Sequence, residues 1–100
     1  MERPLDPEYC TTMPEVRAGV DAVDAALIAL IAKRFGYMRA AARIKSERGQ
    51  VRDETRKAEV IANAVAAAER LAIPTAPIAA LWNDLVEASI AYEFERFDER

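Results

Sequence analysis

Basic and polar side chains interrupt otherwise apolar helical stripes at four positions. Arg34 and Lys45 lie eleven residues apart, about three helical turns, so both point the same way with Cα atoms roughly 16 Å apart along the axis. Ser89 and Glu93 are four residues apart, which places them on one face of a helix. Buried charges need a partner or a ligand, and two long basic side chains that lean toward each other could bind a small anion. We therefore predict an anion-binding site on these inward faces.

Each of these residues also has a plainer interpretation. Long basic side chains reach solvent from the edge of a helix, and an apolar stripe tolerates one serine. Other chemistry is excluded by composition, because the chain has no histidine and a single cysteine, Cys10. A zinc site of the usual kind, a disulfide framework and a Ser-His-Asp or Cys-His nucleophile are therefore not expected. We predict no metal and no cofactor.

Three helical segments must position these residues. The first runs from Pro14 to about Glu47, after an extended arm at residues 1–12 in which Thr11 or Thr12 can cap the helix, and Gly49 ends it. Asp53 is a good N-cap for a second helix that ends near Ala72. Pro74 and Pro77 bracket a short linker, and Pro77 opens a third helix that ends near Asp98. Apolar residues recur every three or four positions in each segment. In the first helix they are Val16, Val20, Val23, Leu27, Leu30 or Ile31, Met38 and Ala41, and in the second they are Val60, Ile61, Ala64, Val65, Ala68 and Leu71. In the third they are Ile78, Leu81, Trp82, Leu85, Val86, Ile90 and Phe94.

The predicted fold class is therefore all-α, with one long, one medium and one long helix in a single domain of 100 residues. A first helix of about 33 residues measures roughly 50 Å. A compact domain of this size has a diameter near ~35 Å, estimated from its radius of gyration. The excess apolar length must pack on something else, most economically the same helix of a second copy, so we predict a homodimer.

The charge balance excludes some partners. The net charge is −3, from 14 basic and 17 acidic residues, and nucleic acid or an anionic membrane would require a basic excess. We interpret most of the local basic stretch, which holds Arg34, Arg39, Arg43, Lys45, Arg48 and Arg52, as a solvated helix face. The N-terminal residues contain no apolar signal region, and no run reaches transmembrane length, so we expect a cytoplasmic location.

The joint spacing of charged residues across the three helices resembles that of the all-helical chorismate mutases. The resemblance covers about residues 13 to 97 and rests on the segments VRAGVDAVDAALIALIAKRFGYMRAAARIK, VRDETR and LWNDLVEASIAYE. In that family an arginine near the start of the first helix, an arginine seventeen residues later and a lysine eleven further line the site. Here these positions hold Arg17, Arg34 and Lys45.

The resemblance continues in the second and third helices. Asp53 and Arg56 match the family's aspartate and arginine, and Ser89 matches its serine. The chain departs from the family pattern at two positions. Glu93 replaces a glutamine, and Lys57 replaces an acidic residue that contacts the substrate hydroxyl.

The resemblance implies a pericyclic rearrangement of chorismate to prephenate in the shikimate pathway of aromatic amino-acid biosynthesis. It implies that arginines bind the two carboxylates of the substrate and that Lys45 bridges a carboxylate and the ether oxygen. Planar guanidinium groups match carboxylates, and donors aimed at the breaking ether oxygen stabilise the transition state. We expect Arg34 and Arg17 to bind carboxylates with help from Arg56. Lys45 and Glu93 donate to the ether oxygen. Asp53 and Ser89 bind the ring hydroxyl or a carboxylate at the rim.

Two predictions follow for this arrangement. Arg17 lies about 25 Å along the helix from Arg34 and about 42 Å from Lys45, so a small ligand cannot contact all three on one helix. If they serve one site, Arg17 comes from the partner subunit, and an intertwined dimer holds two shared sites. A carboxylate donates a hydrogen bond only when protonated, so we expect activity to fall as pH rises and Glu93→Gln to flatten the profile. The alternative for Glu93 is a salt bridge at the rim with Arg96 or Lys45.

Two other functions stay open at the level of sequence. The N-terminal PEYCT and the segment YMRAAARIK also resemble the isochorismate-pyruvate lyases of salicylate formation, which use the same Arg, Arg, Lys framework. A non-catalytic helical dimerisation or regulatory module would explain the long first helix but would leave Arg34, Lys45 and Glu93 unexplained.

Overall fold

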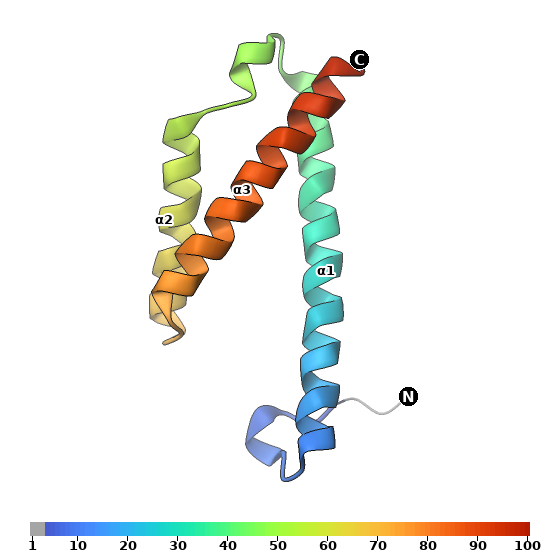
Figure 1. Ribbon diagram of the computed structural model, residues 1–100, viewed down its shortest axis with the longest axis vertical. Helices are drawn as coiled ribbons and strands as arrows, with labels where there is room; N and C mark the ends of the chain where they lie inside the picture. The colour runs from blue at the N-terminus through green and yellow to red at the C-terminus, as the bar shows by residue number, and fades with distance from the viewer. Residues whose placement is uncertain (1–3) are drawn as a thin grey trace. The chain divides into compact units, whose positions relative to one another are not determined.

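The computed structural model describes residues 4–100, and all regular structure in that range is helical. Three α-helices follow one another: α1 (Met13–Ile44), α2 (Glu54–Arg70) and α3 (Thr75–Asp98) (Figure 1). Short 3-10 helices, η1 (Pro7–Tyr9) and η2 (Arg48–Gln50), precede and follow α1. The predicted all-α class is confirmed. The chain forms two compact units, Met1–Arg34 and Phe35–Arg100, whose boundary falls inside α1, and the single domain stays a prediction.

A reciprocal cap starts α1 at Met13, one residue before the predicted start. The Thr12 hydroxyl accepts a hydrogen bond from the Glu15 N–H at 3.4 Å, and the Glu15 carboxylate accepts from the N–H groups of Thr11 and Thr12 at 3.0 and 2.9 Å. Such a capping box satisfies N–H groups that have no partner inside the helix. These hydrogen bonds lower the pKa of Glu15, and the one from the Thr11 backbone has the largest effect.

The end of α1 lies at Ile44, three residues before the predicted end. The side-chain oxygen of Gln50 accepts hydrogen bonds from the N–H groups of Ser46 and Glu47 at 2.9 and 3.0 Å, which turns the chain into η2. The prediction that Gly49 ends the helix was wrong. Gly49 lies inside η2 and does not have a positive φ, so the turn does not depend on the freedom of glycine.

The predicted extended arm is only partly correct over its described residues, 4–12. Pro7–Tyr9 form η1, which is closed by hydrogen bonds from the Tyr9 N–H to the Asp6 carbonyl at 3.0 Å and from the Cys10 N–H to the Pro7 carbonyl at 3.2 Å. Proline suits this first turn because its φ is already fixed near the helical value. The arm and the first turns of α1 line a mainly apolar cavity of about 500 Å³, with Leu5, Val16 and Val20 among its lining residues.

Helices α2 and α3 form an antiparallel hairpin within the second unit and pack side by side (Figure 1). Asp53 caps α2 as predicted, because its carboxylate accepts the Arg56 N–H at 3.0 Å. Ala72 in the link has a φ of 57°, the left-handed conformation that commonly ends a helix. The helix α3 begins at Thr75 after Pro74, so Pro77 lies in its first turn and does not open it as predicted.

The second unit has a small core that combines apolar and polar side chains. Its buried apolar residues are Ala42 of α1, Val51 after η2, Ala68 of α2 and Val86 of α3. Ser89 and Glu93 of α3 are equally buried, at 3% and 4% exposure. A carboxylate in such a place is costly unless it is paired, so its contacts identify the region where function should be sought.

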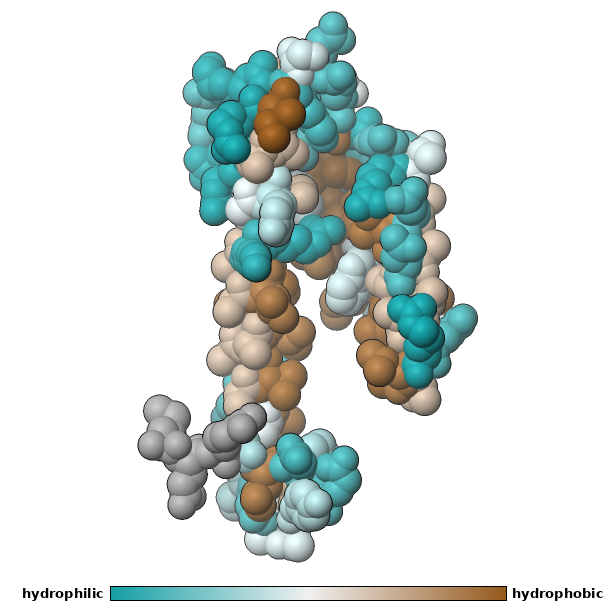
Figure 2. Space-filling view, turned by 180° about the vertical axis from the view of Figure 1, so that it is seen from behind, coloured by the Kyte–Doolittle hydropathy of each residue, from teal (hydrophilic) through white to brown (hydrophobic). Residues whose placement is uncertain are grey.

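The first unit presents an apolar helix surface. Every residue from 21 to 30 is exposed, and within this run Val23, Leu27, Ile28 and Leu30 are 49–66% exposed. Figure 2 shows apolar side chains along this part of α1. Large contiguous apolar surfaces are uncommon on monomeric soluble proteins. No helix within residues 4–100 is long and apolar enough to cross a membrane.

Candidate functional site

A buried ion pair between Lys45 and Glu93 forms the centre of the candidate site. The Lys45 Nζ lies 2.7 Å from the Glu93 Oε2, and the side chains are 28% and 5% exposed. Lys45 is the first residue after α1, and its N–H still bonds to the Ala41 carbonyl at 2.9 Å. Glu93 lies on α3, 48 residues away in sequence. The predicted salt bridge with Lys45 is therefore present, but the predicted place at the rim is wrong, because Glu93 is buried.

Ser89 lies one helical turn before Glu93 on the same face of α3. Its hydroxyl donates a hydrogen bond to the Leu85 carbonyl of its own helix at 2.7 Å. Ser89 was predicted at the rim, whereas the structure buries it. A serine that bonds back to its helix can switch its hydroxyl to a ligand by rotation about one bond. Ser89 thus adds a small polar group next to the buried carboxylate.

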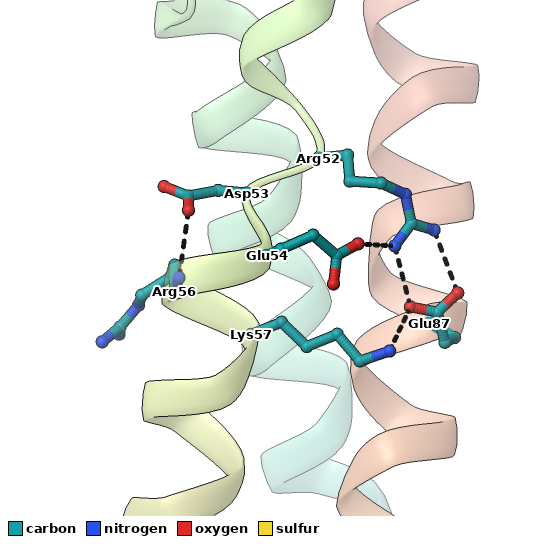
Figure 3. A network of polar contacts seen from close by, with 6 residues as sticks. All are labelled: Arg52, Asp53, Glu54, Arg56, Lys57 and Glu87. Carbon is teal, nitrogen blue, oxygen red and sulfur yellow. Dashed lines mark hydrogen bonds and ion pairs between the residues drawn. The ribbon is translucent and has the colours of Figure 1, made fainter.

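Asp53 and Arg56 are exposed and have no contact with Lys45 or Glu93 within residues 4–100. The Asp53 carboxylate caps α2, and the Arg56 guanidinium pairs with Glu59 one turn later. Figure 3 shows the Asp53 and Arg56 side chains on the side of α2 that faces away from Glu87. Their predicted contact with substrate stays a prediction.

Arg17 and Arg34 both belong to the unit Met1–Arg34. Both lie on α1, which is one continuous helix over Met13–Ile44, so they are about 25 Å apart along its axis. Arg17 is exposed, and Arg34 is half-buried. The expectation that one small ligand cannot contact Arg17, Arg34 and Lys45 on one helix stays a prediction.

A second charged group, which sequence reasoning missed, joins the start of α2 to α3 (Figure 3). We call it the Glu87 cluster: Arg52, Glu54, Lys57 and Glu87. Arg52 forms a bidentate pair with Glu87, with N–O distances of 2.9 and 3.1 Å, and also bonds to Glu54 at 2.8 Å. The Lys57 Nζ lies 2.9 Å from Glu87. Hydrogen bonds from Arg52, then Lys57, lower the pKa of Glu87 to about 2. Hydrogen bonds to Glu87, then Glu54, raise the pKa of Arg52.

An arginine–tyrosine contact links α1 to α3 near the candidate site. The Arg39 Nη1 donates to the Tyr92 hydroxyl at 3.0 Å, and the Phe35 ring meets the Tyr92 ring edge-on at a centroid distance of 5.0 Å. The hydrogen bond from Arg39 is the main cause that lowers the pKa of Tyr92. Tyr92 precedes Glu93, so this contact helps to hold the α3 turn that carries the buried carboxylate.

The chemistry available at this site is charge recognition and hydrogen bonding. Within residues 4–100, no group of three or more His, Cys, Asp or Glu side chains could hold a metal ion. The pair of Lys45 and Glu93 provides one ammonium group and one carboxyl group at the centre of a helical unit. The ammonium group can bind an anion and donate hydrogen bonds to a developing negative charge, whereas the carboxyl group donates only when it is protonated.

The structure thus combines an all-helical fold with a buried lysine–carboxylate pair. Compared with known families, the sequence matches chorismate mutase type II over residues 16–94, which cover α2, most of α1 and most of α3. The chain belongs to this family, and its activity is that of a chorismate mutase, an isomerase. A comparison with curated proteins found no match.

Proposed function

We propose that the chain converts chorismate to prephenate at a site centred on Lys45 and Glu93. The observation that carries this proposal is the buried contact of 2.7 Å between their side chains. A buried ion pair seldom stabilises a fold more than apolar packing would, so stability alone does not account for it. A dianionic substrate with a breaking ether bond accounts for both groups.

The reaction needs donors at the ether oxygen and cations at the two carboxylates. Negative charge develops on the ether oxygen as the C–O bond breaks, and Lys45 donates to it while binding one carboxylate. Donors placed there stabilise the transition state more than the ground state. Arg34, Arg17 and Arg56 bind the carboxylates, and Asp53 and Ser89 bind the ring hydroxyl or a carboxylate. The bound conformation brings the two carbons that form the new bond together.

Glu93 determines the pH dependence in this proposal. In the protein without substrate, Glu93 accepts a hydrogen bond from Lys45. An ether oxygen only accepts, so Glu93 donates to it only after taking up a proton. A substrate carboxylate then replaces the Glu93 carboxylate at Lys45.

The test is the loss of chorismate absorbance with purified protein at pH 5, 6, 7 and 8. We expect kcat to fall toward pH 8 in the wild-type protein and to stay level in Glu93→Gln, whose amide donates at every pH. Glu95→Gln is the matched control, since it removes an exposed carboxylate two residues away on α3. A level wild-type profile would overturn the role of Glu93. Turnover of isochorismate alone, run in parallel, would assign the chain to isochorismate-pyruvate lyase chemistry.

We also propose that two copies of the chain associate through α1. The exposed run that includes Val23, Leu27 and Leu30 is the surface that association would bury. Burial of apolar surface contributes about 25 cal/mol per Å². Arg17 lies too far along α1 from Arg34 for one helix to place both at one ligand, so each site takes Arg17 from the partner subunit.

Sedimentation velocity tests this association. Leu27→Glu places a charge in the apolar run, so we expect the sedimenting mass to fall from that of two chains to that of one. Activity should fall with it, because each site then lacks the arginine of the partner. Ala32→Glu, outside the run on the same helix, is the control. A wild-type protein that sediments as one chain would contradict the proposal.

The location of the enzyme and its metabolic pathway are further parts of the proposal. We propose that the enzyme acts in the cytoplasm, in the shikimate pathway of aromatic amino-acid biosynthesis. Complementation of a bacterial strain that lacks chorismate mutase, on medium without phenylalanine and tyrosine, is the test. Growth with the wild-type gene and none with Lys45→Ala is expected.

A further inference from the structure

The segment between α1 and α2, residues 45–53, is fastened to α3 at two separate points. We call it the α1–α2 linker. Arg48 forms a bidentate pair with Asp98, with N–O distances of 2.9 and 3.3 Å. Arg52 forms a second bidentate pair with Glu87, at 2.9 and 3.1 Å. Paired N–H···O bonds of this kind fix the direction of the guanidinium as well as its distance.

Other contacts hold the same segment. The Arg48 guanidinium lies over the Phe94 ring at 4.4 Å from its centroid, and Val51 is buried at 4% exposure. Arg100, two residues after α3 ends, donates to the carbonyls of Ala42 and Lys45 at 2.9 and 2.5 Å. The last carbonyls of a helix have no partner inside it, so Arg100 fixes the point at which α1 ends.

The two fastening points, Arg48 and Arg52, lie between the two linker residues that the proposed function needs. Lys45 is the first residue of the linker and Asp53 is the last. Glu87 and Asp98 are eleven residues apart on α3, about 16 Å along its axis. Glu93 lies between them, and the Lys45 ammonium contacts it. Both ends of the linker are therefore set against the same helix that carries the buried carboxylate.

We propose that Asp98 and Glu87 are positioning residues, which hold the α1–α2 linker so that Lys45 and Asp53 keep the places required for turnover. This inference rests on the proposed function. Among residues 4–100, neither carboxylate forms a hydrogen bond or ion pair with Lys45 or Asp53, so each acts through an arginine of the linker. A displacement of about 1 Å at a reacting group can cost 10²-fold in rate. The pKa of Asp98 is lowered, chiefly by its hydrogen bond from Arg48, so this pair stays ionised at pH 5 to 8.

The first test compares neighbouring carboxylates at the end of α3. Asp98→Asn removes the charge that holds Arg48, whereas Glu99→Gln removes the charge that pairs with Arg96 and leaves the linker untouched. We expect Asp98→Asn to lower kcat about tenfold with KM changed less than about threefold, and Glu99→Gln to change neither. Glu87→Gln should act like Asp98→Asn, and the double variant should lose more than either.

Two further measurements separate positioning from general damage. The charge swap Arg48→Asp with Asp98→Arg restores an ion pair, so it should recover most of the lost kcat, which a folding defect would not do. Limited digestion with trypsin measures how accessible the α1–α2 linker is, and it needs no substrate. Trypsin cuts after Lys45, Arg48 and Arg52. Cleavage at Lys45 and Arg52, mapped by mass spectrometry, should be several times faster in Asp98→Asn than in Glu99→Gln.

The outcomes distinguish this inference from the proposed function. Wild-type turnover together with unchanged kcat and unchanged cleavage in Asp98→Asn and Glu87→Gln would overturn the inference alone. A lower kcat that the charge swap fails to recover, with a matching loss of folded protein by circular dichroism, would overturn it as well. No turnover of chorismate by the wild-type protein would overturn the proposed function, and with it the role in turnover assigned to Asp98 and Glu87.

Discussion

Glu87 and Glu93 lie six residues apart on α3, and each pairs with a lysine from another part of the chain. The distances are alike, 2.9 Å to Lys57 and 2.7 Å to Lys45. The surroundings are not, because the side chain of Glu87 is 39% exposed and that of Glu93 is 5% exposed. Exposed pairs are screened by water and salt and contribute little, whereas a buried pair is costly to break. Burial, and not contact distance, therefore separates the two carboxylates.

Their other partners differ in the same sense. Glu87 holds two cations, since Arg52 binds it together with Lys57, and its pKa falls to about 2. It remains a carboxylate throughout the pH range in which the protein would act. Glu93 pairs with the partly buried Lys45, and the small hydroxyl of Ser89 lies one turn away. We expect this second arrangement to be the one in which a ligand can replace a partner.

The largest expected difference lies in turnover of the matched lysine variants. Lys45→Ala should lower kcat about 10²- to 10³-fold, as does the loss of a single donor at a developing oxyanion elsewhere. Lys57→Ala should leave kcat within about threefold, because it breaks only a partly exposed pair and Arg52 still holds Glu87. Steady-state kinetics on chorismate measures both. Equal losses in the two variants would remove the distinction between the two pairs.

The next difference concerns stability. Lys45→Met leaves the Glu93 carboxylate buried and unpaired, which should cost about 3–5 kcal/mol, reduced to the extent that Lys45 is exposed or Glu93 takes up a proton. The double variant Lys45→Met with Glu93→Leu replaces both charges by apolar groups. It should match the wild-type free energy of unfolding or exceed it by about 1–4 kcal/mol. Urea unfolding followed by circular dichroism measures all three proteins.

The activity of that double variant shows whether the buried pair serves function or stability. We expect it to be stable and inactive, which would assign the buried pair to function at the expense of stability. A double variant less stable than Lys45→Met alone would show instead that the pair supports the fold.

Local signals in the sequence account for the parts of the fold that could be predicted. The helices follow from apolar residues every three or four positions, and the cap of α2 follows from Asp53, whose carboxylate bonds three residues ahead. The end of α1 could not be predicted from Gly49. It is set by Gln50 and by Arg100, which reaches back 55 residues to the Lys45 carbonyl. Contacts over such separations leave no mark in local periodicity.

The candidate site divides in the same way. Polar residue types on apolar stripes pointed to Lys45 and Glu93, and the structure brings these two together. The pairing of Arg52 with Glu87 escaped prediction, because a basic stretch read residue by residue looks like a solvated helix face. Its partner lies 35 residues away on another helix. The sequence held one signal of this cluster, the departure from the family pattern at Lys57. The Lys57 ammonium group pairs with Glu87.

The smallest expected effect is a change in acid stability at Glu87. The folded-state pKa of Glu87 is about 2, below the ordinary value of 4.5, so the folded protein binds this proton less readily than the unfolded chain. The pair therefore contributes its full stabilisation above pH 4.5, and this contribution is lost as pH falls toward 2. Glu87→Gln should be slightly less stable than wild type at pH 7 and equally stable at pH 2.

Thermal unfolding at pH 7, 4 and 2 measures this convergence, with Glu99→Gln, at an exposed carboxylate directly after α3, as the control. High salt should shrink the difference at pH 7, because Glu87 is partly exposed and its pair is screened. The difference in stability between wild type and Lys45→Met, which breaks the buried Lys45–Glu93 pair, should not shrink in the same salt, since little solvent reaches Glu93. A Glu87 effect that resists salt as strongly as the effect at Glu93 would mean that exposure does not separate the two carboxylates of α3.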